Sequence, residues 1–304
     1  MKQSVKYLLC ALLFGACTIS CDKEDPIDPN KDIPDLGGDE IEMTDTDRWL
    51  YDNYVVPYNI EVKYRWDASD MTSSIDKQLT PVKEELVVPF MKVMHDVWFA
   101  PYEKTAGADF VKRITPKKVV LTGSPEYEFG AIKLGQAEGG RKILLLNVNG
   151  FDASNADNVK RFLHTIEHEF AHILHQTQLF DKNYETISAG NYLPSGWTGV
   201  SDSEARLLGF ITPYSMSGKD EDFVEMVSMI MVYGRDWYEN TVLVQAGSHG
   251  ASLLRQKEQI MVDYMKSVWN IDFYDSIDGK GLVTCVQEAI EKVVAENRPT
   301  DTNQ

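Results

Sequence analysis

Cysteine is scarce in this chain of 304 residues: there are four, and only Cys285 lies beyond residue 21. A single cysteine cannot form a disulfide within that part of the chain. It also cannot build a structural zinc site, which usually needs several thiolates. We therefore expect the folded part to be stabilised by its hydrophobic core and by any metal that it binds.

Basic residues are also few, with 30 Lys and Arg against 47 Asp and Glu, so the formal net charge is −17. Because nucleic acids and anionic lipids attract positive charge, this balance argues against either as the main partner. The sequence also contains no phosphate-binding glycine loop and no internal repeat. These absences argue against a P-loop nucleotide site and against a repeat architecture.

The N-terminus carries a short apolar stretch, residues 7–19, which follows two lysines. It is too short to remain as a membrane-spanning helix, and it has the layout of a secretory signal. Its end resembles a bacterial lipoprotein signal. The resemblance implies removal of residues 1–20 and lipid attachment at Cys21, with Cys17 as the competing position. Removal would take away two lysines and no acidic residue, shifting the formal net charge from −17 to −19.

Residues 21–46 are rich in Asp, Glu, Pro and Gly and nearly lack aromatic residues, which predicts a flexible acidic tether. An acidic run just after a lipidated cysteine resembles the surface-export signals of Bacteroidetes lipoproteins. The resemblance implies an outer-membrane lipoprotein that faces outward, with the periplasmic face as the alternative. Because the chain is acidic, attachment would depend on acyl chains rather than on a basic patch.

Folded structure is expected from about residue 47, and local patterns predict its first elements. Residues 58–66 alternate apolar and polar side chains, as in a half-buried strand. The segment 84–99 has helical periodicity, whereas 118–121 and 143–148 are short apolar runs typical of strands. Between these runs, the Gly-Gly-Arg sequence at 139–141 would make the turn of a hairpin.

Helices are predicted for most of the later chain. The longest covers about 155–177, with Asn155 or Ser154 as its N-cap. Ser201 begins a capping-box pattern that ends at Glu204 and starts a second helix. Further helices are expected at about 220–233, 252–269 and 281–296.

The most informative motif lies in the longest predicted helix, where four of the six histidines fall between residues 164 and 175. The run from His168 through Glu169 to His172 has the form H-E-x-x-H. Histidines four apart lie on one helical face about one turn from each other, so both can bind a single Zn²⁺. Glu169 is then placed to act on a water that the metal activates. The spacing predicts a hydrolytic metal site.

A catalytic zinc usually has three protein ligands and one open position. His164 and His175 are poor third ligands, because ligands along one straight helix would span about 10 Å, whereas tetrahedral zinc holds its ligands within about 3–4 Å of one another. We expect both to be solvated or to support a ligand, and the metzincin extension is absent. The alternative is a carboxylate from another helix. Glu221 and Glu225 lie four apart, so one could bind zinc while the other orients a ligand histidine.

Here the sequence resembles the gluzincins, which combine H-E-x-x-H with a downstream Glu ligand and a second carboxylate four residues later. The segment 212–225 also resembles the corresponding segment of anthrax lethal factor, with Tyr214 seven residues before Glu221. These resemblances imply a complete set of roles: His168, His172 and Glu221 as zinc ligands, Glu225 as the acceptor that orients a ligand, and Tyr214 as a catalytic hydroxyl.

The layout from about residue 47 to 295 resembles the zinc-binding metallopeptidase lipoproteins of Bacteroidetes, also known as substrate-import-associated zinc metallohydrolases. The shared features are the lipoprotein start, a Tyr-Asn-Ile-x-Val-x-Tyr-Arg-Trp strand, H-E-F-x-H and a Tyr…Glu-Asp-Phe-x-Glu helix. One departure, at 226–228, concerns packing rather than ligation. The resemblance implies an α+β fold: a zincin-like catalytic domain with a small mixed sheet and an active-site helix over 47–235, a mainly helical part over 236–297 and a disordered tail over 298–304.

Two further expectations concern the substrate. In zincins an edge strand beside the active helix often holds an extended substrate by β-addition. Residues 143–148 are the candidate for this strand, although an ordinary buried strand fits the sequence equally well. Loops make the specificity pocket, and 180–200 is a candidate loop with Tyr192, Pro194 and Trp197. A packing role for its aromatic residues is the favoured interpretation.

Together these features predict an exported, lipid-anchored metallopeptidase with Zn²⁺ as cofactor and a peptide or protein as substrate. Glu169 would accept a proton from the water, and Tyr214 would stabilise the oxyanion or the leaving group. The alternative is a non-catalytic lipoprotein that binds a peptide or glycan for nutrient uptake. In both cases we expect association with outer-membrane import components. His95 and His249 are interpreted as bystanders.

Overall fold

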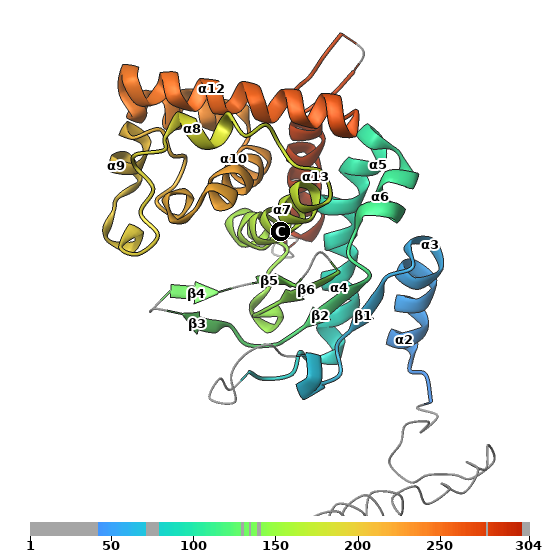
Figure 1. The fold of residues 1–304 in the computed structure, drawn as a ribbon. Coiled ribbons are helices and arrows are strands. Elements are labelled where there is room, and N and C mark those ends of the chain that lie inside the picture. The colour runs from blue at the N-terminus through green and yellow to red at the C-terminus, as the bar shows by residue number, and fades with distance from the viewer. Residues whose placement is uncertain are drawn as a thin grey trace, which may run out of the picture. The chain divides into compact units, whose positions relative to one another are not determined.

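The structure is a computed structural model that describes residues 42–70, 79–128, 131–133, 135–138, 141–277 and 279–299 (Figure 1). The predicted signal, the lipid attachment site Cys21, the first part of the predicted tether and the end of the predicted tail lie outside the described residues. From Met43 onward the described residues belong to one compact unit. Among the described helices, none combines the length and the apolar character needed to cross a membrane.

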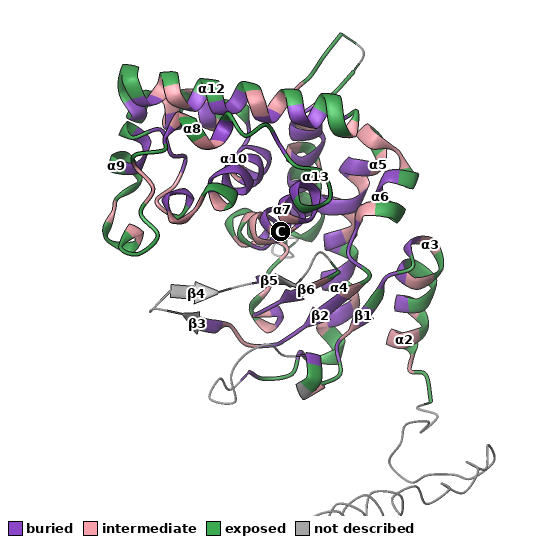
Figure 2. Cartoon of the chain, in the orientation of Figure 1, coloured by how far each residue is buried: buried purple, intermediate pink, exposed green. Residues whose placement is uncertain are grey.

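The longest helix predicted from the sequence is α7, Ala156–Thr177 (Figure 1). It begins at the predicted cap, because the Asn155 side chain accepts hydrogen bonds from the backbone N–H groups of Asp157 and Asn158. The helix also has a buried apolar face (Figure 2), which consists of Phe162, Ile166, Phe170, Ile173 and Leu174. The predicted helix and its cap are therefore confirmed.

A four-stranded sheet in the order β1-β2-β6-β5 packs against α7. The strands are β1 (Glu61–Lys63), β2 (Lys118–Leu121), β5 (Gly135–Glu138) and β6 (Lys142–Leu145). β1, β2 and β6 run parallel, and β5 runs antiparallel to β6. A Cβ atom on Gly135 would lie 2.3 Å from Thr165 Cγ2 of α7, so the absence of a side chain lets β5 lie directly against α7.

This strand order corrects two predictions. Residues 143–148 are not an edge strand, because β6 lies between β2 and β5; the alternative of an ordinary buried strand holds. The hairpin joins β5 to β6, whereas β2 and β6 are parallel neighbours. The chain between β2 and β6 forms β3 (Glu126–Glu128), β4 (Ala131–Lys133) and β5 before it returns beside β2. The predicted turn glycines at 139 and 140 lie outside the described residues.

The strand predicted at 58–66 is shorter than expected. Helix α3 (Val56–Tyr58) ends at Asn59, which has a left-handed φ of 56°, and only Glu61–Lys63 pairs with β2. The predicted alternation of burial is present from Tyr58 to Tyr64, with Tyr58, Ile60, Val62 and Tyr64 all buried, but Trp66 is exposed. The sequence pattern therefore predicted side-chain burial correctly up to Tyr64 and overestimated the extent of hydrogen-bonded pairing.

The two faces of the sheet contribute to different hydrophobic clusters. Val119 and Ile143 belong to the main core, which also holds the buried residues of α7. The alternate residues Val120 and Leu144 face the other side, where they form a small cluster with Leu79 and Leu146. Burial of both faces explains why β2 and β6 are continuous apolar runs rather than alternating ones.

The other helices before α7 either precede β1 or lie between β1 and β2, and a short 3₁₀ turn follows β6. The helix predicted at 84–99 is present, as α4 followed by a π-helical turn, and the chain remains helical beyond it. The elements of this part are α2 (Asp45–Leu50), a π-helical turn (Tyr51–Val55), η2 (Ala68–Asp70), α4 (Glu84–Met94), a π-helical turn (His95–Phe99), α5 (Ala100–Ala106), α6 (Ala108–Ile114) and η4 (Val148–Gly150).

The part after α7 is mainly helical, as predicted (Figure 1). The capping box predicted at Ser201 and Glu204 is present at the start of α9. α12 begins earlier than predicted and contains a kink at Gly247, where φ is 61°. The elements are α8 (Tyr184–Ile187), η5 (Trp197–Gly199), α9 (Asp202–Leu207), η6 (Tyr214–Ser217), α10 (Lys219–Tyr233), α11 (Arg235–Trp237), a π-helical turn (Tyr238–Val242), α12 (Leu243–Trp269) and α13 (Leu282–Asn297).

One hydrophobic core extends from the early helices to α13. Phe223 of α10, Met261 of α12 and Ile290 of α13 belong to the same buried cluster as Phe170 of α7. Elements on both sides of the predicted boundary at residue 235 therefore share this core, and the division into two parts stays a prediction. The small mixed sheet, the long central helix and the helical C-terminal part confirm the predicted α+β class.

Candidate metal centre

His168 and His172 face α10, which packs against α7 (Figure 1). Their Nε2 atoms approach one carboxylate oxygen: Glu221 Oε2 lies 3.0 Å from His168 Nε2 and 3.4 Å from His172 Nε2. Glu221 lies in the first turn of α10, where the helix dipole favours negative charge. The fold thus brings Glu221 to two histidines that lie 49 and 53 residues before it in the chain.

These three residues fit a zinc ion. Their donor atoms all lie within 4.8 Å of one another, and two imidazoles with one carboxylate are a donor set used by catalytic zinc sites. Glu221 Oε2 is buried, and apart from these two imidazole nitrogens it has no hydrogen-bond partner among the described residues. Leaving a buried carboxylate oxygen unpaired is costly. A cation between the three donor atoms would satisfy this oxygen.

His168 and Glu221 strongly affect each other's protonation. Burial disfavours the charged imidazolium of His168, but hydrogen bonds to Glu221 and Glu225 outweigh burial and raise its pKa to about 10. Burial also acts to raise the pKa of Glu221, but hydrogen bonds to His168 and His172, together with their charges, hold that pKa well below its usual value. Zinc binding would therefore have to displace a proton from His168.

Glu225 lies one turn after Glu221 on α10, and its side chain is buried. Its Oε1 atom lies 2.9 Å from both His168 Nδ1 and His164 Nε2, and Thr212 Oγ1 donates to Oε2 over 2.7 Å. Burial would raise the pKa of Glu225, but the charge of His164 and the hydrogen bonds to both histidines hold it well below its usual value. Because the Nδ1 atom of His168 donates to the Glu225 carboxylate, the ring is held with its Nε2 atom facing Glu221.

A second cluster of potential metal ligands shares His168 and consists of His164, His168 and Glu225. Both oxygens of Glu225 are already paired with donors at ordinary hydrogen-bond distances. In contrast, the donors near Glu221 Oε2 within the described residues are the Nε2 atoms of His168 and His172, which would themselves bind the metal. This difference favours the cluster that contains Glu221 as the metal position.

The outer two histidines of the run contact the site without joining that cluster. His164 donates to Glu225, and the Nε2 atom of His175 lies 3.0 Å from Nδ1 of His172. His175 is only 3% exposed, so it supports a candidate ligand and is not solvated. Burial, followed by the charge of His172, lowers the pKa of His175.

Glu169 and Tyr214, the two predicted catalytic residues, lie on different elements. Glu169 is half-buried on α7, between the two histidines. Tyr214 begins the η6 turn just before α10, and its ring centroid lies 5.7 Å from that of His168. Partial burial and the negative charges of Glu221 and Glu225 raise the pKa of Tyr214 well above its usual value. Its hydroxyl therefore stays protonated and can donate a hydrogen bond.

A buried ion pair next to Glu221 was missed by the sequence analysis. Lys257 of α12 is fully buried, and its Nζ atom lies 2.6 Å from Asp222 Oδ2 and 2.7 Å from Gly209 O. Tyr192 also donates to Asp222 Oδ2, over 2.8 Å. Lys257 gave no local signal, because it lies in a polar run, 255–259, that is typical of a solvated helix face.

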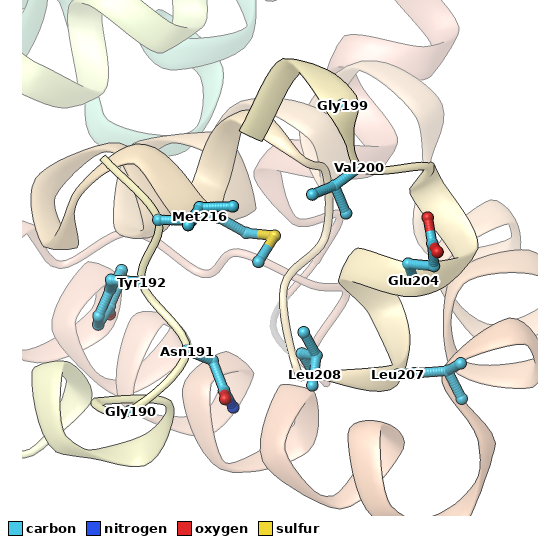
Figure 3. A pocket seen from close by; sticks show the side chains of 10 residues that line it. Gly190, Asn191, Tyr192, Gly199, Val200, Glu204, Leu207, Leu208 and Met216 are labelled. Atoms are coloured by element: carbon cyan, nitrogen blue, oxygen red, sulfur yellow. The ribbon is translucent and has the colours of Figure 1, made fainter. Parts of the chain in front are cut away.

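The loop at 180–200 contributes to a surface pocket of about 560 Å³ (Figure 3). Tyr192 lines this pocket together with Met216, which lies on the same η6 turn as Tyr214. Trp197 packs its ring 5.0 Å from that of Tyr214, and Pro194 is not among the lining residues. The Tyr192 ring lies 5.2 Å from the ring of Phe210. Tyr192 and Trp197 therefore both make packing contacts, which was the favoured interpretation. Neither His95 nor His249 belongs to the metal-capable clusters of the described residues.

Comparison with known proteins identifies the family. The family model described as "Putative zinc-binding metallo-peptidase" matches residues 39–274, whereas no curated protein matched the chain. A solved structure of a "putative zinc-binding metallo-peptidase from Bacteroides caccae" is similar, with 35% sequence identity and a TM-score of 0.68 over 85% of this chain and 95% of that chain. The family description names the predicted cofactor, Zn²⁺. On these matches, the chain belongs to this family of zinc-binding metallo-peptidases.

Proposed function

We propose that this protein is a zinc-dependent hydrolase that cleaves peptide bonds, with His168, His172 and Glu221 as metal ligands. The observation that carries the proposal is the approach of two imidazole Nε2 atoms, at 3.0 and 3.4 Å, to the buried Oε2 of Glu221, which has no other hydrogen-bond partner among the described residues. The family match over residues 39–274 supports the same chemistry. Glu169 lies between the two histidines, where a peptidase needs its general base.

Each residue around the ligands has a separate task in the proposed reaction. The carboxylate of Glu169 accepts a proton from the attacking water and delivers it to the leaving amine. Zinc, when bound, polarises the scissile carbonyl and lowers the pKa of water. The protonated hydroxyl of Tyr214 donates a hydrogen bond to the developing oxyanion or to the leaving group. Glu225 holds the His168 ring in the orientation that leaves its Nε2 atom free for the metal.

The sheet supports a peptide or protein as the substrate. β5 lies against α7, and within the described residues it has no strand on its outer side. An extended peptide can pair with such a strand through main-chain hydrogen bonds, which bind without regard to sequence. The presence of both Glu169 and Tyr214 beside the ligands favours catalysis over a purely binding role.

We also propose that the protein is exported and anchored by lipid at Cys21, in the outer membrane and beside nutrient-import components. The support is the apolar stretch at 7–19, the cysteine that follows it and the acidic run after that cysteine. Metabolic labelling with a palmitate analogue in the native host tests this anchor. We expect label in the wild type and none in Cys21→Ala. Equal label in both would contradict the assignment.

Glu169→Gln tests the catalytic proposal most directly. The variant keeps the shape of the side chain but cannot accept a proton, so we expect peptide cleavage to fall by about 10²–10⁴-fold while zinc content is unchanged. Cleavage is measured on a broad peptide library with the zinc-loaded protein, before and after chelation. Glu291→Gln, at an exposed position on α13, is the matched control. Undiminished cleavage by Glu169→Gln, or a zinc-loaded wild type that cleaves no peptide, would show the proposal to be wrong.

A further inference from the structure

His175 is a buried histidine of the run that makes no hydrogen bond or ion pair with a carboxylate among the described residues. Its hydrogen bond is to His172, a proposed zinc ligand. We propose that His175 is a positioning residue for the metal: its neutral Nε2 atom accepts the Nδ1 proton of His172 and so fixes His172 with its Nε2 lone pair facing the zinc. This inference rests on the proposed function, because it takes His172 to be a ligand.

The proton positions follow from the geometry. His172 Nε2 lies 3.4 Å from Glu221 Oε2, on the side of the metal, so it must carry a lone pair when zinc is bound. The proton of a neutral His172 is then on Nδ1, which lies 3.0 Å from His175 Nε2. For this contact to be a hydrogen bond, His175 Nε2 must be unprotonated. His175 is therefore neutral and carries its own proton on Nδ1.

The surroundings of His175 hold it in this role. The ring is 3% exposed and lies near the rings of Phe180 and Phe223, at centroid distances of 5.7 and 6.4 Å. Its Nδ1 atom is buried and has no hydrogen-bond partner among the described residues. A buried unpaired N–H costs on the order of 1–3 kcal/mol. A phenylalanine would fill the same apolar space without that cost, so packing alone does not explain a histidine here.

The arrangement also differs between the two proposed histidine ligands. His168 donates its Nδ1 proton to the carboxylate of Glu225, which is the common partner of a zinc-bound histidine. His172 donates instead to a neutral ring. Because the site already holds Glu221 and Glu225, a neutral acceptor orients His172 without adding another buried negative charge.

Substitutions that separate shape from hydrogen bonding test the proposal. His175→Phe keeps a ring but removes the acceptor, whereas His175→Gln has an amide oxygen that can accept from His172 Nδ1. We expect His175→Phe to weaken zinc binding by about 10–100-fold and His175→Gln to restore much of that loss. The measurements are the zinc Kd, by competition with a chromophoric chelator, and the visible spectrum of the Co²⁺-substituted protein. His249→Phe, at an exposed position on α12, is the control.

The outcomes are distinguishable. If His175→Phe binds zinc as tightly as the wild type and gives the same Co²⁺ spectrum, the positioning role is wrong even though the metal site stands. If His172→Ala leaves zinc binding unchanged, the proposed function itself fails, because His172 is then not a ligand. Circular dichroism of the zinc-free proteins shows whether each variant folds. Should His175→Phe not fold, His175→Leu replaces it as the variant without an acceptor, with the same expected loss.

Discussion

Two acidic residues flank His168, and their environments differ. Glu169 is half-buried, whereas Glu167 is fully buried and accepts a hydrogen bond from Tyr102 over 2.8 Å. Burial raises the pKa of Glu167 to about 8, although the Tyr102 hydrogen bond acts to lower it. Its Oε1 atom has no partner among the described residues. A protonated acid suits this position, because an ionised carboxylate buried with one partner would be far more costly.

The raised pKa of Glu167 predicts that the stability of the fold depends on pH. The pKa of Glu167 is about 8 in the folded state and near 4.5 in the unfolded state, so its contribution is fully present below about pH 4.5 and is lost as the pH rises through about 8. Glu167→Gln keeps the acceptor for Tyr102 without a charge. We expect the free energy of unfolding of the variant, relative to that of the wild type, to be about 2–4 kcal/mol higher at pH 8.5 than at pH 5.

Urea unfolding of the zinc-free proteins at the two pH values measures this gain. Glu291→Gln, on the exposed face of α13, should follow the wild type at both. If Glu167→Gln and the wild type lost stability in parallel between the two pH values, Glu167 would already be ionised at pH 5.

At the scale of elements, α12 fixes the first turn of α10, which carries Glu221. Lys257 of α12 pairs with Asp222 of α10 at 2.6 Å, and both side chains are fully buried. The same lysine donates to the backbone oxygen of Gly209, and its Nζ atom lies 4.1 Å from the centroid of the Phe210 ring. A buried ion pair of this kind contributes little net stability compared with apolar residues, but breaking it leaves a buried charge.

Lys257→Met therefore should destabilise the protein strongly, by about 3–5 kcal/mol, because Asp222 loses its partner. Adding Asp222→Asn in the same chain removes the uncompensated charge, so the double variant should recover a large part of the loss. Denaturant unfolding at neutral pH measures the free energy of unfolding of the wild type, of Lys257→Met, of Asp222→Asn and of the double variant. Additive losses from the two single variants would contradict a coupled pair.

The sequence predicted the elements that depend on local signals and missed those that depend on long-range pairing. α7 and α9 were predicted because Asn155 and Ser201 are caps that act within a few residues. The position of β6 inside the sheet was not, because strand order depends on how the chain returns beside β2 after β3, β4 and β5. No local pattern distinguishes an inner strand from an edge strand when both faces are apolar.

The candidate site shows the same division. Spacing could predict His168, His172 and the pair Glu221 and Glu225, because residues four apart share a helical face. The buried position of Lys257 could not be predicted, since it depends on how α12 packs on α10 and on the Gly209 carbonyl. The supporting contact of His175 depends equally on a ring orientation that spacing does not determine.

At the scale of the whole molecule, the proposed zinc ion joins two helices of one core. Its ligands come from α7 and α10, which belong to the main hydrophobic cluster together with the sheet. A ligand that binds only the folded state stabilises it by RT ln(1 + [L]/Kd), about 4 kcal/mol when its concentration is 1,000 times Kd. Zinc should therefore raise the unfolding temperature, and chelation should lower it.

The pKa of His168 makes this stabilisation depend on pH. In the zinc-free protein that pKa is raised to about 10, above its ordinary value of 6.5, so the imidazolium contributes stability below about pH 6.5 that is lost as the pH rises toward 10. Zinc must displace this proton, so the apparent affinity for zinc should rise about tenfold per pH unit below pH 10.

Differential scanning fluorimetry with zinc or chelator at pH 6, 7 and 8 should then show a zinc-dependent shift of the unfolding temperature that grows with pH. His172→Ala should show almost none. A shift that is equal at all three pH values would mean that zinc displaces no proton, and a full shift in His172→Ala would place the metal elsewhere.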